Sequence, residues 1–146
     1  MTASVEMAGN ALQAIRNETI RAGSLETGGG LFGNEQGNRF TVLEATGPGT
    51  HYDASDVHFT PNTEVLHRQI DDAERRGLVY LGEWHRHPGS LTVPSDGDMQ
   101  TFAHMLDRMP IDSLLMAIAT KNGFGVDLHA YVVRRDGCTA LGFFRI

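Results

Sequence analysis

Cysteine is almost absent from this chain, since Cys138 is the only one among its 146 residues. A single cysteine excludes an intrachain disulfide and cannot supply the Pro-Cys-x-x-Cys zinc ligands of the nucleobase deaminases. Cys138 follows a predicted turn and has no partner pattern around it, so we do not expect a catalytic thiol. The scarcity of cysteine fits a reducing compartment, and we expect a cytoplasmic protein.

Long apolar runs and an excess of basic charge are also missing. No run approaches the roughly 20 residues of a membrane-spanning helix, and residues 1–16 lack the regions of a signal peptide. Lys and Arg number 12 against 18 Asp and Glu, a formal net charge of −6, which argues against a nucleic-acid partner. We therefore expect neither a membrane nor a nucleic acid as partner, and one domain over residues 1–146.

Hydrophobic spacing predicts an α/β protein. Four glycines between residues 28 and 33 interrupt one predicted strand, and glycines in such a place usually permit the close approach of another backbone or a ligand. Apolar residues three and four apart predict helices at 4–22, 61–76 (capped by Thr60) and 95–108, and shorter runs predict strands at 26–33, 39–46, 78–84, 114–120, 125–134 and 139–145. This order predicts a mixed sheet sandwiched between helices.

Residues 85–88 read His-Arg-His-Pro and follow the apolar strand at 78–84. Residues two apart in a strand face the same side, so the imidazoles of His85 and His87 can converge on one point. The proline predicts the end of the strand, and Asp98 follows in the first turn of the next helix. Two imidazoles and one carboxylate suit Zn²⁺ and leave the fourth tetrahedral position for water. We interpret His85, His87 and Asp98 as the ligands of one zinc ion per chain.

Plainer explanations exist for each part of this pattern. Seven histidines can fall two apart by chance, and Ser95 followed by Asp98 is also an ordinary capping box. The combination of His-x-His-Pro, six residues, Ser, two residues and Asp is far more specific. It resembles the signature of the JAMM metalloproteases, the JAB or MPN domain family. The resemblance covers nearly the whole chain and implies a three-layer MPN domain, a mixed sheet flanked by helices with a cytidine-deaminase-like architecture.

Two carboxylates compete for the role of general base, which takes a proton from the zinc-activated water and returns it to the leaving amine. Strand parity places Glu83 on the same face as His85. The resemblance favours Glu26, because the base of the family heads an early strand in a Glu-Thr/Ser-Gly-Gly context, which residues 26–29 match. Glu83 is expected one pleat deeper, or on the flank of the sheet.

The resemblance also gives Ser95 a catalytic role beside its structural one. The matching serine of the family donates a hydrogen bond to the oxyanion of the tetrahedral intermediate, while the same residue can cap the helix. Asp98, as a metal ligand, is not expected to serve fully as the reciprocal cap. Arg86 departs from the Ser or Thr usual between the two histidines; parity points it away from the metal, where it is expected to leave zinc binding intact and to touch the substrate.

Known JAMM enzymes cleave the peptide or isopeptide bond after the C-terminal tail of ubiquitin or a ubiquitin-like protein. Residues 82–88 resemble bacterial stand-alone JAB proteins, several of which are encoded beside E1-like and E2-like enzymes, some in anti-phage defence systems. The family holds the substrate tail on the segment between the glycine-rich strand and the second helix, here residues 47–59, by strand addition. Two alternatives stay open: a peptidase that trims a sulfur-carrier ubiquitin-fold protein, and a non-catalytic MPN scaffold.

Overall fold

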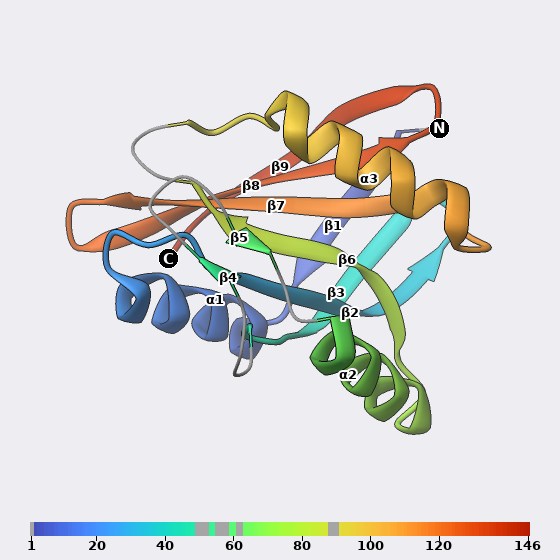
Figure 1. Ribbon diagram of the computed structural model, residues 1–146, viewed down its shortest axis with the longest axis horizontal. Helices are drawn as coiled ribbons and strands as arrows, with labels where there is room; N and C mark the ends of the chain where they lie inside the picture. The colour runs from blue at the N-terminus through green and yellow to red at the C-terminus, as the bar shows by residue number, and fades with distance from the viewer. Residues whose placement is uncertain (1, 49–52, 55–58, 61–62, 88–90) are drawn as a thin grey trace.

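A mixed seven-stranded sheet carries three helices in the computed structural model, which describes residues 2–48, 53–54, 59–60, 63–87 and 91–146 (Figure 1). The strand order is β1-β3-β2-β6-β7-β8-β9, with β1–β3 and β6–β7 parallel and the other pairs antiparallel. The elements are β1 (Ser4–Met7), α1 (Gly9–Ala22), β2 (Gly28–Gln36), β3 (Arg39–Ala45), β4 (Asp53–Ala54), β5 (Phe59–Thr60), α2 (Thr63–Arg75), β6 (Val79–Arg86), α3 (Asp96–Arg108), β7 (Ser113–Asn122), β8 (Gly125–Arg134) and β9 (Gly137–Arg145).

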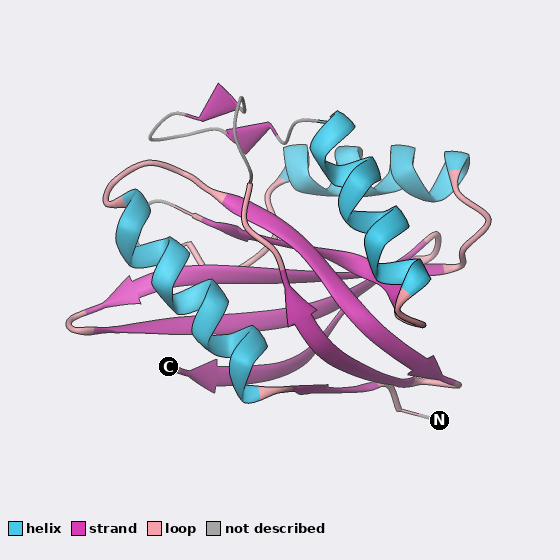
Figure 2. Cartoon of the chain, turned by 90° about the horizontal axis from the view of Figure 1, so that it is seen from below, coloured by secondary structure: helices cyan, strands magenta, loops and turns pink. Residues whose placement is uncertain are grey.

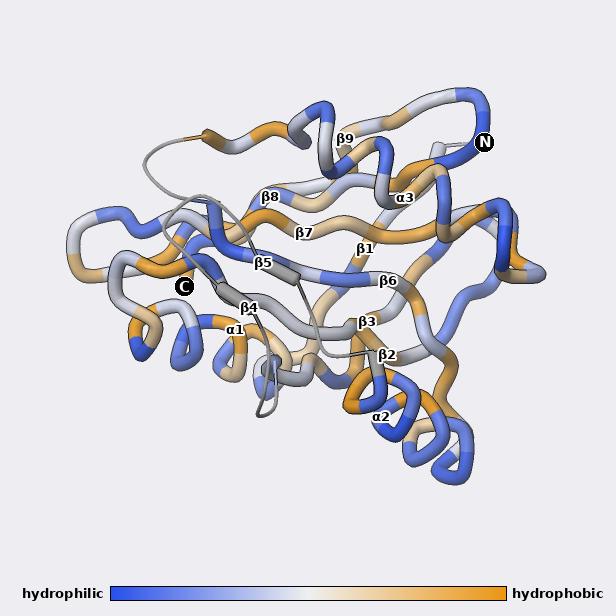
Figure 3. The backbone as a smooth tube through the Cα atoms, viewed as in Figure 1, coloured by the Kyte–Doolittle hydropathy of each residue, from blue (hydrophilic) through white to orange (hydrophobic). Residues whose placement is uncertain are grey.

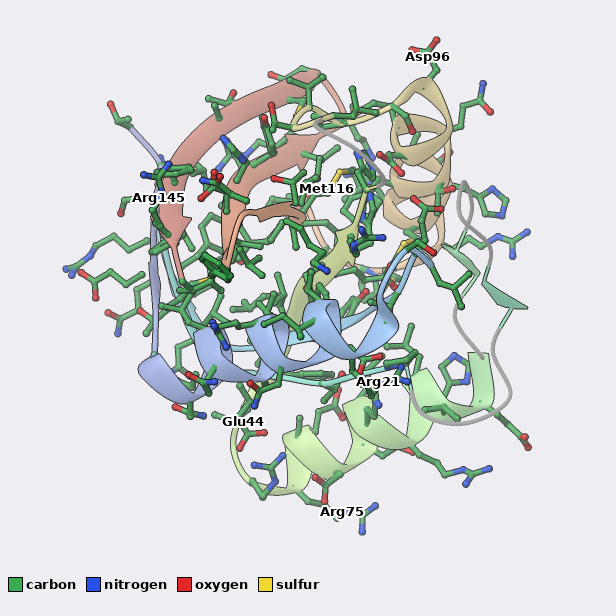
Figure 4. All side chains as sticks on the ribbon, turned by 90° about the vertical axis from the view of Figure 1, so that its left-hand side faces the viewer. Arg21, Glu44, Arg75, Asp96, Met116 and Arg145 are labelled. Atoms are coloured by element: carbon green, nitrogen blue, oxygen red, sulfur yellow. The ribbon has the colours of Figure 1, made fainter. Side chains whose placement is uncertain are left out.

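The two faces of the sheet carry different helices. On one face α1 packs with Ala11 and Ile15 onto a core that includes Trp84. On the other, α3 packs with Phe102 and Leu106 onto a second core that includes Met116. Figure 1 shows α1 and α3 on either side of the central strands, and Figure 4 shows Met116 between them. The expected α/β fold, a mixed sheet flanked by helices, is confirmed.

Strand β7 lies beside β6, the middle strand of the seven. Residues 114–120 are all buried, because neighbouring strands pair on both edges and helices cover both faces. The tube in Figure 3 is hydrophobic along most of this strand, whereas neighbouring β6 carries several hydrophilic positions. A strand buried on both faces is expected to read as one apolar run. The polar positions of β6 are therefore the exceptional ones in the middle of the sheet.

The N-terminal residues are a strand, so the prediction of one helix from residue 4 to 22 was wrong over its first turn. Ser4–Met7 pairs in parallel with β3, in register Val5 to Phe40, and forms an edge of the sheet. Val5 and Met7 alternate toward the core while their neighbours are exposed. The apolar residues at the start of the chain fit both a helical spacing and the alternation of a strand. Pairing with β3 favours the strand. The helix proper begins at Gly9 and ends before Gly23.

The glycine-rich strand is packed too closely against β3 for side chains. A Cβ atom at Gly29 would lie 1.8 Å from the carbonyl oxygen of Thr46, and one at Gly33 would lie 1.9 Å from that of Thr41. The glycines therefore serve the close approach of a neighbouring backbone, which confirms one of the two expectations for them.

The second helix is described over Thr63–Arg75, and its predicted start at residue 61 stays a prediction. Thr60, the predicted cap, pairs with Asp53 in the short β4–β5 ladder. Pro61, and most of the proposed tail-binding segment at 47–59, lie outside the described residues. The third helix and the C-terminal meander lie where predicted, with strands one to two residues longer at some ends. Figure 2 shows the helices against the sheet from below. No helix in the described part of the chain is long and apolar enough to cross a membrane.

Candidate metal centre

Strand β6 delivers the two histidines to one end of the sheet. His85 pairs across β2 with Gly28 and across β7 with Ile118. His87 lies one residue beyond β6, but its N–H still donates to the carbonyl oxygen of Ala119 at 3.0 Å, so the backbone stays extended. Both imidazoles therefore project from the same face, which is the face covered by α3. His87 is 3% exposed, while His85 remains partly open to solvent.

The first turn of α3 delivers the carboxylate. Ser95 is the N-cap, and its Oγ accepts the N–H of Asp98 at 3.1 Å while its own N–H donates to Asp98 Oδ2 at 2.8 Å. Asp96, two residues earlier, is exposed and points away from the sheet (Figure 4). The capping box thus fixes one carboxylate of the turn toward β6 and leaves the other in solvent.

The three side chains converge on one small volume. Asp98 Oδ1 lies 3.3 Å from His85 Nε2 and Oδ2 lies 3.0 Å from His87 Nε2, while the two imidazole nitrogens are 2.7 Å apart. One ligand atom from each residue lies within 4.8 Å of the others. Bonds of about 2.05 Å to a tetrahedral Zn²⁺ would place two nitrogens about 3.3 Å apart. Side-chain shifts of a few tenths of an ångström therefore suffice for a metal ion, and the donor set fits zinc.

The outer nitrogen of His87 has a partner that fixes the ring. Nδ1 lies 3.2 Å from the carbonyl oxygen of Leu91, which can only accept, so Nδ1 carries the hydrogen and Nε2 presents its lone pair to the cluster. The segment that supplies this carbonyl is itself held, because the hydroxyl of Tyr131 donates to the carbonyl oxygen of Thr92 at 2.6 Å. Sequence reasoning missed both supports, since neither residue belongs to a motif.

Asp98 serves both as a member of the cluster and as the reciprocal cap, so the expectation that the two roles compete was wrong. Oδ2 accepts the Ser95 N–H at 2.8 Å and also lies 3.0 Å from His87 Nε2. Burial by itself would raise the pKa of Asp98, but the contacts with His85 and His87 and the bond from Ser95 outweigh it and hold that pKa far below its ordinary range. These contacts therefore favour the carboxylate form of Asp98, which is the form that can bind a metal ion.

Glu26 precedes β2 and is buried, with 6% of its surface exposed. The N–H of Arg86 donates to the carbonyl oxygen of Thr27, so these two residues stand opposite each other and the antiparallel register continues beyond Gly28. Alternation then assigns Glu26 to the face of His85 and His87. Among the described residues Glu26 is not part of the three-residue ligand group.

Glu83, the rival carboxylate, lies one pleat before His85 and opposite Gly30. The hydroxyl of Tyr80 donates to its Oε1 at 3.1 Å. Burial raises the pKa of Glu83, and the bond from Tyr80 and the charge of His85 offset only part of that increase. The Glu83 carboxyl is bonded to Tyr80 and lies farther from the end of β6 than the histidines. It is therefore poorly placed to reach a water molecule beside them.

Arg86 points to the opposite face, as parity requires, but it is not available at the surface. Only 7% of the residue is exposed, and its Nη1 donates to the carbonyl oxygen of Leu25 at 3.0 Å. This burial argues against the expected contact with substrate, which stays untested. Of the remaining histidines, His51 and His58 lie outside the described residues, His67 and His104 are exposed, and His129 stacks against Phe143.

Comparisons with known proteins give the family of this chain. Residues 9–136 match the family described as prokaryotic homologs of the JAB domain. A protein named CD-NTase/cGAS isopeptidase from Enterobacter hormaechei subsp. hoffmannii (strain UCI 50) is 29% identical over 100 residues, which cover 67% of this chain and 56% of that protein. A protein of the same name from Escherichia coli (strain TW11681) is 29% identical over 86 residues, covering 54% and 53%. The chain thus aligns with about half the length of these curated relatives.

The solution structure of protein DSY2949 from Desulfitobacterium hafniense has the same fold. It superposes with a TM-score of 0.75 and covers 93% of this chain and 88% of its own, at 20% sequence identity. At that identity the likeness concerns the architecture alone.

Proposed function

The chain belongs to the family of prokaryotic JAB-domain homologs, and on that premise we propose that it is a zinc-dependent isopeptidase acting after the C-terminal tail of a ubiquitin-like protein. The observation that carries the proposal is the convergence of His85, His87 and Asp98 at the rim of β6. Two neutral imidazoles and a carboxylate with an open fourth position are the donor set of a catalytic rather than a structural zinc site. Residues 1–146 would form one catalytic domain.

The metal, when bound, would act as a Lewis acid that lowers the pKa of a water molecule and polarises the carbonyl of the bond to be cut. Two of its three ligands would be held by neighbours that this chain supplies: the Leu91 carbonyl for His87 and the Ser95 N–H for Asp98. Because both supports are backbone groups, the ligand geometry depends on the loop and helix cap rather than on further side chains.

Glu26 would take the proton of the attacking water as the oxygen adds to the carbonyl carbon. It would then return that proton to the amine nitrogen as the carbon–nitrogen bond breaks, leaving a carboxylate on the tail and a free amine. Ser95 Oγ accepts the Asp98 N–H, which leaves its own hydrogen to donate to the oxygen of the carbonyl as negative charge develops there. Burial of Glu26 would keep bulk water from competing for the proton.

The relatives named CD-NTase/cGAS isopeptidase support the choice of an isopeptide bond. We place this chain in the same kind of system: a ubiquitin-like protein joined to a CD-NTase, with E1-like and E2-like enzymes forming the bond and this protein removing it in the bacterial cytoplasm. The alternative of trimming a sulfur-carrier precursor would use the same chemistry on a linear peptide bond. A non-catalytic scaffold would not require a buried Glu26 beside a complete ligand set.

The test uses two probes, a ubiquitin-like protein linked through its terminal glycine to a lysine of a CD-NTase and a linear fusion of the same two proteins. The zinc-loaded chain is expected to release the ubiquitin-like protein from the first probe, ending at the intact tail by mass spectrometry. Glu26→Gln and chelator-treated protein are the inactive controls, with recovery on adding zinc. Cleavage that continues in a His85→Ala/His87→Ala variant would contradict the proposal, and a preference for the linear probe would favour precursor trimming.

A further inference from the structure

We propose that Arg86 is a positioning residue for Glu26, the proposed catalytic base. It holds the backbone on either side of Glu26 by hydrogen bonds to the carbonyl oxygens of Leu25 and Thr27. The inference rests on the proposed function for the role of Glu26. The bracing itself concerns only this chain and can be measured without a substrate.

Two bonds from Arg86 flank Glu26 in sequence. The guanidinium Nη1 donates to the carbonyl oxygen of Leu25 at 3.0 Å, and the backbone N–H donates to the carbonyl oxygen of Thr27 at 2.8 Å. Glu26 lies between these two anchored carbonyls, just before β2 begins. The peptide units 25–26 and 27–28 are held in this way, which restricts the soft torsions of the two residues between them, since the backbone has only two such torsions per residue.

The same short segment is tied to α1. Thr27 Oγ1 donates to Glu18 Oε1 at 2.8 Å, and Glu18 pairs with Arg21 on the same helix. The side chain of Leu25 offers no comparable anchor, because it is 46% exposed. Leu25 is held through its backbone, in part by Arg86. The arginine side chain therefore connects this segment to β6, the strand that carries the two histidines.

Arg86 is costly to bury, which argues against a role in stability alone. Its Nε lies buried with no acceptor among the described residues, a loss that an apolar side chain of similar length would avoid. The buried guanidinium is therefore retained at a cost, at a position where its Nη1 holds the Leu25 carbonyl beside the base.

The consequence is a rigid link between base and ligands. Arg86 is the residue between His85 and His87, so the strand that sets the two imidazoles also sets the position of Glu26. A proton acceptor displaced by about 1 Å can lose about 100-fold in rate, even when every catalytic group is present. A serine or threonine side chain at this position is too short to reach the Leu25 carbonyl. The arginine therefore holds this segment by a bond that the shorter residues could not make.

The experiment compares Arg86→Met, Arg86→Lys and the control Arg135→Met in the full-length, zinc-loaded protein. Methionine keeps the length of the stem and removes the donors, and lysine keeps the charge and one donor. Arg135 is a matched control, because its Nη2 also donates to a backbone carbonyl, that of Leu106 near the end of α3. Three quantities are measured: zinc per chain, amide hydrogen exchange at residues 25–28, and kcat and KM on a ubiquitin-fold protein carrying a C-terminal aminomethylcoumarin amide.

We expect Arg86→Met to keep its zinc, to exchange the amides of residues 25–28 about tenfold faster, and to lower kcat by about 10- to 100-fold with KM within about twofold. Arg86→Lys is expected to recover part of both losses, and Arg135→Met to show neither. If Arg86→Met does not fold, Arg86→Lys carries the test, with a smaller loss of the same kind.

Unchanged exchange at residues 25–28 in either folded Arg86 variant would overturn the bracing. Faster exchange with unchanged kcat would overturn the link to catalysis. A wild-type protein that cleaves no probe would contradict the proposed function instead, and the exchange measurement would still decide whether Arg86 holds the segment.

Discussion

Tyr131 gives the sharpest test of how the metal centre is held. Its hydroxyl donates to the Thr92 carbonyl at 2.6 Å, and the adjacent carbonyl, that of Leu91, is the partner of His87 Nδ1. Tyr131→Phe removes the hydroxyl alone and leaves the ring in the core around α3, where it packs beside Met116. The substitution therefore loosens the segment before Ser95 without touching any ligand.

The magnitude follows from one lost hydrogen bond. A typical intramolecular bond contributes about 0.5–1.5 kcal/mol net, and about 1.4 kcal/mol corresponds to a tenfold change in an equilibrium constant. If the lost hydrogen bond mainly makes the orientation of the His87 ring less well fixed, zinc affinity should fall about 2- to 10-fold. That is less than the 10- to 100-fold typical when a direct outer partner of a ligand is removed. The melting temperature should fall by only about 2–4 °C.

Competition with a chromophoric chelator measures the zinc affinity, and thermal unfolding of the metal-free protein measures the stability. Thr19→Val is the control, because Thr19 is buried and its Oγ1 donates to the Ile15 carbonyl at 2.7 Å in α1, away from the cluster. It should lower the melting temperature by a similar amount and leave zinc affinity unchanged. Equal zinc affinity in Tyr131→Phe and wild type, with a lowered melting temperature, would show that the Thr92 anchor does not reach His87.

Three further outcomes are expected at the site itself. The His85→Ala/His87→Ala double variant should lose most of its zinc by elemental analysis, since one remaining ligand cannot retain the ion; full occupancy would refute the ligand assignment. Glu26→Gln should keep zinc and lose activity, whereas Glu83→Gln should retain far more; kinetics with the two results reversed would make Glu83 the base. Ser95→Ala should lower kcat by about 100-fold with a smaller change in KM, and should destabilise the fold by about 1 kcal/mol through the lost cap; an unchanged kcat would leave Ser95 as a cap only.

Much of the architecture could be predicted because its signals are local. The third helix and the three C-terminal strands rest on apolar spacing and a helix cap, which act within a few residues of the chain. The first helix was predicted to begin too early, because the spacing of residues 4–7 does not reveal that they pair with β3.

The candidate ligands were within reach of the sequence because they lie close together along the chain. His85 and His87 are two apart on one strand, and Asp98 is only 11 residues beyond His87 at a helix cap that its own motif marks. The parts that orient them are distant: Arg86 reaches a carbonyl 61 residues away and Tyr131 one 39 residues away. Such contacts exist only once the register between strands is set, and a slip of one residue would turn each side chain to the other face. The sequence can therefore name the groups that do chemistry, while the register of β6 against β2 and β7 determines whether those groups meet in a productive geometry.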